Sequence, residues 1–264
     1  MPLAGNYFTY NGISSHSYGL FFANVHTAPS HKYGEAVTYQ TACFSNNGRR
    51  EILSTSYETP LEFEAELVSE TPLDAETLRE VGNWLFQSPN YAKLVIDSED
   101  YEGIYFNCVF NQTEVYEYAV GSSYGACVLK VLISCDAPWC WEEEKTKTYA
   151  SSEIGSTMLF DNTSDDRGYL YPKVVFTTGE TGGEAVIQNV TDNNRQVRVI
   201  SLNPNETVTL TPEPKQILSS SNRNLYSSFN KKFPRFLPGE NQFSVTGDVV
   251  SLSITYQNAR KAVI

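Results

Sequence analysis

The stretch FTYNGISSHSYGL, residues 8–20, decides the first element of the fold. Phe8 and Tyr10 alternate with a polar residue, which is the period of a strand that buries one face. Asn11-Gly12 follows directly, and this dipeptide tolerates the positive φ angles of a two-residue hairpin turn. The pattern therefore predicts a strand, a tight turn and a second strand at the start of the chain.

The composition places the chain among mainly β proteins. Its 264 residues are 41% hydrophobic and 19% charged, which is enough apolar material for one large or two ordinary domains. The 17 tyrosines and 14 phenylalanines favour strands, as do the many valine, isoleucine and threonine residues. This composition argues against global disorder.

Charge and cysteine usage narrow the function classes. A formal net charge of −12, with no Lys/Arg cluster larger than a pair, argues against specific nucleic-acid binding, which needs a basic surface. We expect no membrane insertion and no secretory signal, since the apolar runs are short and the N-terminus has no basic start. The five cysteines lack paired Cys-x-x-Cys spacing, which predicts reduced and mostly buried thiols.

Residues 34–59 predict the longest hairpin of the chain, with Asn47-Gly48 at its turn. Its length and the basic pair Arg49-Arg50 at its tip suggest a surface for contacts with other subunits. We therefore expect an interface formed by Asn47, Gly48, Arg49 and Arg50. Residues 61–67 then alternate apolar and acidic side chains, which predicts a half-buried strand with a negative outer face.

One helix is predicted after this strand. Thr71 would be its N-cap, with Pro72 in the first turn and Asp74 at the third position. Leucine and valine residues recur at helical spacing through residue 85, with Trp84 on the flank of the apolar face. Ser88-Pro89 would end the helix, which we expect to cover one face of a sheet.

The remaining pattern predicts strands only and a division into two domains. The strands expected in the first half span residues 92–96, 104–113 and 126–134. Those expected in the second half span residues 171–177, 184–189, 197–202, 207–211, 242–246 and 249–256. A polar, charged stretch separates the halves, so the predicted domains are residues 1–136 and 152–264, joined by a linker at 137–151.

No catalytic, metal or cofactor site is expected. Gly121-Ser122-Ser123-Tyr124-Gly125 matches the nucleophile elbow of hydrolases, but that elbow needs a helix after it and a later histidine. Here a strand is predicted to follow, and His16, His26 and His31 all precede the motif. The histidines also lack metal-site spacing. Residues 161–168 resemble a calcium loop but lack its glycine at the sixth position.

Several segments, in order, resemble the distal tail (Dit) proteins of long-tailed, non-contractile bacteriophages. The resemblance begins with the quoted N-terminal stretch and covers nearly the whole chain. It continues through residues 83–85, 93–97, 105–108 and 133–139 in the first half, and 171–174, 187–191, 236–245 and 251–256 in the second. The turn Pro238-Gly239-Glu240-Asn241 is the most specific C-terminal element, and Ala137 interrupts the Asp-Pro element that closes the family's first domain.

The resemblance implies a structural protein of the phage virion. The first domain would be a β-sandwich-like, ring-forming unit with one helix and a long hairpin, and the second a galectin-like β-sandwich. Copies of the chain would form a hexameric ring at the tail tip, between the tail tube protein and the tail-associated lysin or fibre protein. Receptor-binding or other baseplate proteins would attach around the side.

A carbohydrate-binding adhesion module is the alternative function. Asn203-Pro204-Asn205 faintly resembles the Asn-Pro element of galectins, although the accompanying histidine and arginine are missing. All three tryptophans precede the second domain, so sugar rings would have to stack on tyrosines such as Tyr169 and Tyr171. Glycan affinity of the second domain would separate this function from a tail-tip scaffold.

Overall fold

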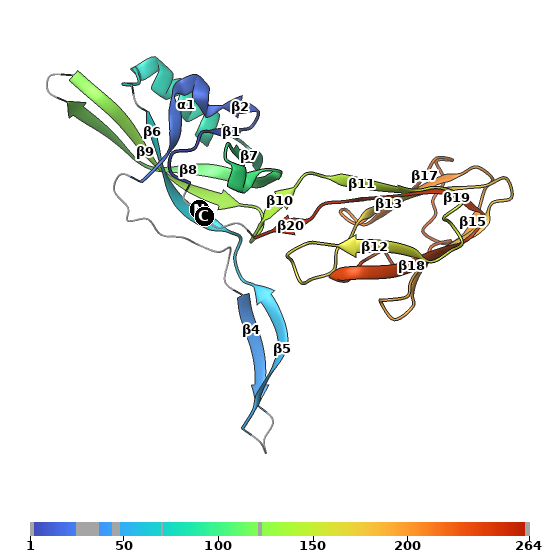
Figure 1. The fold of residues 1–264 in the computed structure, drawn as a ribbon. Helices are drawn as coiled ribbons and strands as arrows, with labels where there is room; N and C mark the ends of the chain where they lie inside the picture. Colours follow the sequence, from blue (N-terminus) through green and yellow to red (C-terminus); the bar gives the residue numbers. More distant parts are fainter. Residues whose placement is uncertain (1–2, 25–36, 44–47, 70, 121–122, 262–264) are drawn as a thin grey trace. The chain divides into compact units, whose positions relative to one another are not determined.

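A computed structural model describes residues 3–24, 37–43, 48–69, 71–120 and 123–261 (Figure 1). The chain divides into two compact units, which we call the first domain (residues 1–142 and 260–264) and the second domain (143–259). Each has its own buried hydrophobic core. The segment 137–151, expected as a linker, holds strand β10 (Cys140–Glu142) of the first domain and β11 (Lys145–Tyr149) of the second.

The first domain is built on a nine-stranded sheet whose main path runs β2-β1-β7-β8-β9-β6-β3. Strand β10 extends it by pairing with β8 and with β20. The other members are β1 (Phe8–Tyr10), β2 (Ile13–Ser14), β3 (Leu20–Ala23), β6 (Glu62–Ser69), β7 (Ala92–Ile96), β8 (Ile104–Val120), β9 (Ser123–Cys135) and β20 (Ala259–Arg260). Two 3-10 helices, η1 (Ser15–Tyr18) and η2 (Glu99–Tyr101), connect strands.

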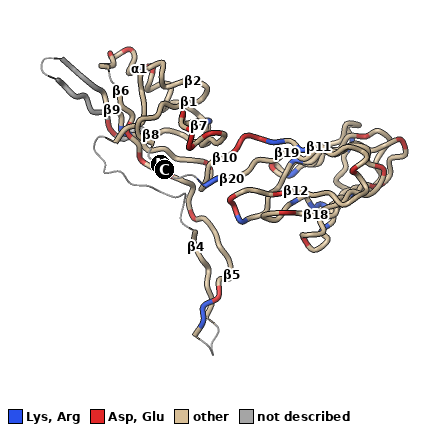
Figure 2. Tube along the Cα trace, viewed as in Figure 1, with Lys and Arg blue, Asp and Glu red and all other residues tan. Residues whose placement is uncertain are grey.

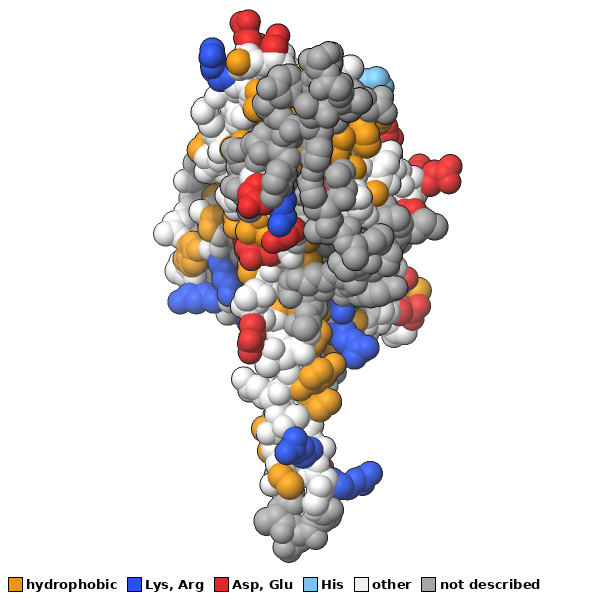
Figure 3. All heavy atoms as spheres, turned by 90° about the vertical axis from the view of Figure 1, so that its left-hand side faces the viewer, with side chains coloured by type: hydrophobic (Ala, Val, Ile, Leu, Met, Phe, Trp, Pro, Cys, Tyr) orange, Lys and Arg blue, Asp and Glu red, His pale blue; other side chains and the backbone are white. Residues whose placement is uncertain are grey.

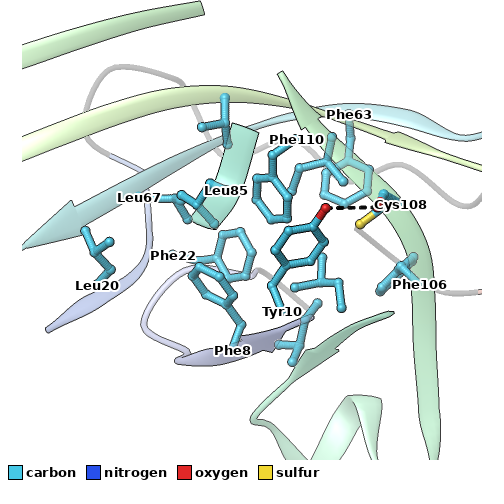
Figure 4. Packing of buried hydrophobic residues seen from close by; sticks show 14 of the residues in the cluster. Phe8, Tyr10, Leu20, Phe22, Phe63, Leu67, Leu85, Phe106, Cys108 and Phe110 are labelled. Atoms are coloured by element: carbon cyan, nitrogen blue, oxygen red, sulfur yellow. Dashed lines mark hydrogen bonds between the residues drawn. The ribbon is translucent and has the colours of Figure 1, made fainter. Parts of the chain in front are cut away.

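The N-terminal hairpin forms as predicted. Asn11 and Gly12 have φ angles of 49° and 78°, and Tyr10 pairs with Ile13 across the turn. The alternation of the quoted stretch buries Phe8 and Tyr10 completely. Figure 4 shows both rings inside the core, where the Tyr10 hydroxyl donates a hydrogen bond of 3.3 Å to the Cys108 carbonyl.

Helix α1 (Ala75–Phe86) begins later than predicted. Its N-cap is Asp74, whose carboxylate accepts a 2.8 Å hydrogen bond from the Thr77 amide, so the assignment of Thr71 as the cap was wrong. The physical reason lies just before the helix. The Ser69 hydroxyl donates to the Thr71 carbonyl at 2.7 Å, so this carbonyl already has a partner other than the first hydrogen bond of a helix capped at Thr71.

Trp84 is a core residue and does not lie on the flank of the helix. Its side chain is buried, and the indole Nε1 donates a 2.9 Å hydrogen bond to the Tyr10 carbonyl. The Phe8 and Tyr18 rings stack on it, with centroid distances of 5.8 and 5.3 Å and interplanar angles of 9° and 28°. Trp84 therefore joins α1 to the first strand of the chain, through a partner that helical periodicity does not reveal.

Strand β6 confirms the predicted alternation but only part of the negative face. Glu62 and Glu64 are exposed, whereas Glu66 is 2% exposed. The position in the sheet explains the difference, because β6 lies between β3 and β9 and Glu66 pairs with Ala23 on one side and Lys130 on the other. The outer face of this strand is thus covered at its C-terminal half.

The second domain is a β-sandwich. One sheet has the order β11-β19-β13-β16-β17 and the other β12-β18-β14-β15. The strands not yet bounded are β12 (Met158–Asn162), β13 (Lys173–Thr178), β14 (Gly183–Asn189), β15 (Arg195–Leu202), β16 (Thr207–Thr211), β17 (Gln216–Ser219), β18 (Gly239–Gly247) and β19 (Val249–Tyr256). The mainly β, two-domain fold is confirmed, and β11, β12 and β17 are strands that the sequence pattern missed.

A buried ion pair fixes one end of this sandwich. The Glu206 carboxylate, 1% exposed, accepts hydrogen bonds from Arg223 Nε at 2.8 Å and Nη2 at 2.7 Å. The Asn203 amide also donates to it at 2.7 Å, as does the Ser219 hydroxyl. Chiefly through the Arg223 bonds, these donors lower the pKa of Glu206 to about 2. The carboxylate therefore stays charged although it is buried.

Candidate assembly interface

The predicted long hairpin forms a separate two-stranded sheet. Its arms are β4 (Val37–Cys43) and β5 (Arg50–Tyr57), paired from Val37 opposite Tyr57 to Cys43 opposite Arg50. Gly48 has a φ angle of 65°, which fits the expected turn residue. Asn47, the other predicted turn residue, lies outside the described residues.

This hairpin exposes large apolar side chains on both arms. Tyr39 is 57% exposed, Ile52 61% and Leu53 63%. Orange apolar side chains are visible along the hairpin in Figure 3. A two-stranded sheet with no covered face is marginally stable in water, and exposed apolar groups of this kind mark interaction surfaces. The geometry therefore favours a hairpin whose exposed apolar side chains are buried against another molecule.

The charges of the hairpin lie toward its turn. Arg49 and Arg50 are exposed there, and the middle of both arms is uncharged (Figure 2). The structure thus brings Gly48, Arg49 and Arg50 together at one end of β5. This arrangement gives an uncharged shaft with exposed apolar side chains and a basic tip, where Arg49 and Arg50 outnumber Glu51.

The hydrolase-like motif follows one strand of the first domain directly and continues into the next. Strand β9 begins at Ser123, and β8 and β9 pair antiparallel on either side of the Gly121-Ser122 position. The strand predicted after the motif is confirmed, so the strand-to-helix turn of a nucleophile elbow does not form there. Within the described ranges, no group of His, Cys, Asp and Glu is arranged to hold a metal ion, and no helix is long and apolar enough to cross a membrane.

The cysteines behave mainly as packing residues. Four of the five are buried, and Cys43 on β4 is exposed. Burial raises the pKa of Cys135 to about 12 and that of Cys108 well above its usual range. A thiol held protonated at neutral pH is a poor nucleophile. The predicted reduced state is consistent with all five being free thiols.

Comparison with known protein families identifies both halves of the chain. A sequence model described as a phage tail protein N-terminal domain matches residues 3–137, and one described as a phage tail C-terminal domain matches residues 139–256. The chain belongs to this family of phage tail proteins. This phage tail protein is thus a structural component of the virion. No curated protein sequence matches it.

Among solved structures, the phage tail protein is similar to the Dit protein of phage SPP1, described as a paradigm of the hub adsorption apparatus in phages that infect Gram-positive bacteria. The two share 11% sequence identity, and the match covers 96% of this chain and 98% of the SPP1 chain with a TM-score of 0.66. The shared fold spans both domains. It confirms the resemblance to distal tail proteins at the level of architecture.

Sequence reasoning missed one cluster of polar residues in the second domain. Arg235 and Asp192 form a two-pronged ion pair beside Tyr169 and Tyr171, two residues named only as isolated tyrosines from the sequence. These residues come from three separate segments. The alternation Tyr-x-Tyr was the only local signal, and nothing in the sequence linked it to the arginine.

Proposed function

We propose that this phage tail protein is the hub of the tail tip, a closed hexameric ring that joins the end of the tail tube to the lysin or fibre protein. Receptor-binding or other baseplate proteins would attach around its side. The carrying observation is the fold shared over both domains with a hub protein. The chain would be made in the bacterial cytoplasm, where its thiols stay reduced.

The β4–β5 hairpin is the natural ring contact under this proposal. Each arm has one open edge of backbone donors and acceptors, and such edges are readily completed by another chain. Repeating one contact between unlike surfaces around an axis closes a ring when the rotation fits. Tyr39, Ile52 and Leu53 would then be covered by the neighbouring subunit.

We expect the purified chain to form a species of six times its 29.6 kDa mass in light scattering, increasingly so as concentration rises. The double variant Ile52→Ser, Leu53→Ser should stay folded but remain a monomer, because it removes apolar area that only the assembly buries. The matched control is Leu218→Ser, which alters a 54% exposed leucine of the second domain. A strict monomer at every concentration would contradict self-assembly of the chain.

The basic tip provides a second test. Replacing Arg49 and Arg50 by glutamate should weaken docking to purified tail tubes while leaving the fold intact, because the change reverses the charge of the proposed contact. Lys231→Glu with Lys232→Glu makes the same charge change on exposed residues of the second domain and should leave docking unaffected. Tail assembly that proceeds equally well with both variants would count against a role for the tip.

A further inference from the structure

Two exposed tyrosines and an arginine are brought to one surface by an isolated bridge in the second domain. Leu170 and Phe236 exchange two backbone hydrogen bonds of 2.9 Å. Phe236 points into the core, where it stacks on Phe160 with a centroid distance of 4.2 Å. Because neighbouring residues of an extended segment point to opposite sides, Tyr169, Tyr171 and Arg235 face away from this core.

The two rings form an open aromatic pair. Tyr169 is 42% exposed and Tyr171 45%, and their ring centroids are 6.3 Å apart at an interplanar angle of 66°. The Arg235 guanidinium carbon lies 3.8 Å from the centroid of the Tyr169 ring. Apolar ring surface, phenol hydroxyls and a cation are therefore presented together to solvent.

Arg235 is held in place before any ligand arrives. Its Nε and Nη2 donate to the two Asp192 oxygens at 2.7 and 3.1 Å, and the Asp192 side chain is only 5% exposed. The Asn189 side chain connects the segments that carry Arg235 and Asp192. Its Nδ2 donates to the backbone carbonyl of Arg235 at 3.0 Å, and its Oδ1 accepts from the backbone N–H of Asp192 at 3.2 Å. A ligand would thus bind without first ordering a long side chain.

The cluster carries surplus positive charge and unused donors. Arg195 Nε lies 3.9 Å from the same Asp192 oxygen and has no hydrogen-bond partner, so two guanidinium groups share one carboxylate. Asp192 engages two of the five N–H groups of Arg235 and the Tyr171 hydroxyl a further one, which leaves two for a ligand. A planar guanidinium with free donors matches a carboxylate or a phosphate.

We propose that Tyr169, Tyr171 and Arg235 form a binding site for a sugar that carries an anionic substituent. The apolar face of the sugar ring would pack on a tyrosine ring, while its carboxylate or phosphate would accept hydrogen bonds from the guanidinium of Arg235. The observations that carry this site lie within the second domain, and it does not depend on the hub function. The same cluster would give the tail tip a direct contact with a charged polysaccharide.

The test is calorimetric titration of the full-length protein with three probes: trigalacturonate, mannose 6-phosphate and neutral galactotriose. A charge-assisted hydrogen bond favours the anionic probe over the neutral one by about tenfold or more. Binding of trigalacturonate alone would identify a carboxylated sugar, and binding of mannose 6-phosphate alone a phosphorylated one. No binding of either at millimolar concentration, or equal binding of galactotriose, overturns the proposal.

Variants assign the binding to these residues. Tyr171→Ala and Tyr169→Ala should each weaken binding of the anionic probe by about tenfold, because each removes apolar ring surface on which the sugar packs. Tyr91→Ala, which alters a 49% exposed tyrosine of the first domain, should leave it unchanged. Amide hydrogen exchange of the second domain verifies that each variant is folded. Unchanged affinity in both folded site variants overturns the proposal.

Discussion

We expect the Glu206→Gln variant to lose about 3 kcal/mol of unfolding free energy in the second domain. The amide cannot match the two-pronged bond to Arg223, and it leaves a cation beside a site that is 1% exposed. All three tryptophans lie in the first domain, so their fluorescence reports that domain only. Native-state hydrogen exchange of β13 and β16 therefore measures the effect, with the fluorescence transition as internal reference.

The same carboxylate predicts a pH dependence. Its folded pKa of about 2 lies below the ordinary value of 4.5, so folding favours the charged form. The stabilisation is fully present above about pH 4.5 and is lost as the pH falls toward 2. In the wild type, the protection factors of the β16 amides, which correct for the intrinsic pH dependence of exchange, should fall over this range more steeply than in Glu206→Gln. Equal pH dependence of both proteins would contradict the assignment.

An exposed ion pair in the same domain is the matched control. Glu184 and Arg198 also form a two-pronged contact, but their side chains are 42% and 54% exposed. Water readily replaces the partners in such a pair, so exposed ion pairs contribute little to the free energy of unfolding. Glu184→Gln should therefore leave exchange in β14 and β15 unchanged. A loss equal to that of Glu206→Gln would show that burial does not decide the effect.

Trp84→Ala should destabilise the first domain by about 3–5 kcal/mol. The substitution opens a cavity next to Phe8 and Tyr18 and leaves the buried Tyr10 carbonyl without the indole donor. Urea unfolding followed by the fluorescence of Trp139 and Trp141 measures the change.

Trp84→Phe separates the contribution of ring packing from that of the indole hydrogen bond. It keeps most of the ring packing but removes the indole N–H, so its cost should be about 1–3 kcal/mol, the penalty for one unsatisfied buried acceptor. A Trp84→Ala variant with an unchanged urea midpoint would place Trp84 outside the core of the first domain. It would also restore the flank position that helical spacing alone suggests.

Local patterns predicted the elements whose signal is contained in neighbouring residues. Asn11-Gly12 indicated its hairpin because the turn depends on two φ angles, and strands β16 and β19 have the predicted ends. β12 was missed because Asn162, a polar residue, occupies its last buried position, where its amide donates to the Leu237 carbonyl at 3.1 Å. Such a residue satisfies its hydrogen bonds through distant partners that the local sequence does not name.

The same limit applies to the candidate sites. The β4–β5 hairpin could be predicted because a turn signal and two strand-like arms lie within one segment. The Arg235 cluster could not, because the bridge between Leu170 and Phe236 joins segments far apart in the chain. The N-cap of α1 was misplaced for a third reason: Thr71 and Asp74 are both good caps, and the choice depends on the hydrogen bond that the Thr71 carbonyl accepts from Ser69.

The way the chain crosses between its domains has a consequence for engineering. It leaves the first domain after β10 and re-enters at β20, and these two strands pair with each other. Within the second domain the corresponding ends are also neighbours, because Lys145 on β11 pairs with Tyr256 on β19. The second domain is therefore a cassette with adjoining ends. We expect that it can be exchanged for another module, or replaced by a short turn between residues 142 and 259, because both residues of β20 then stay with the first domain.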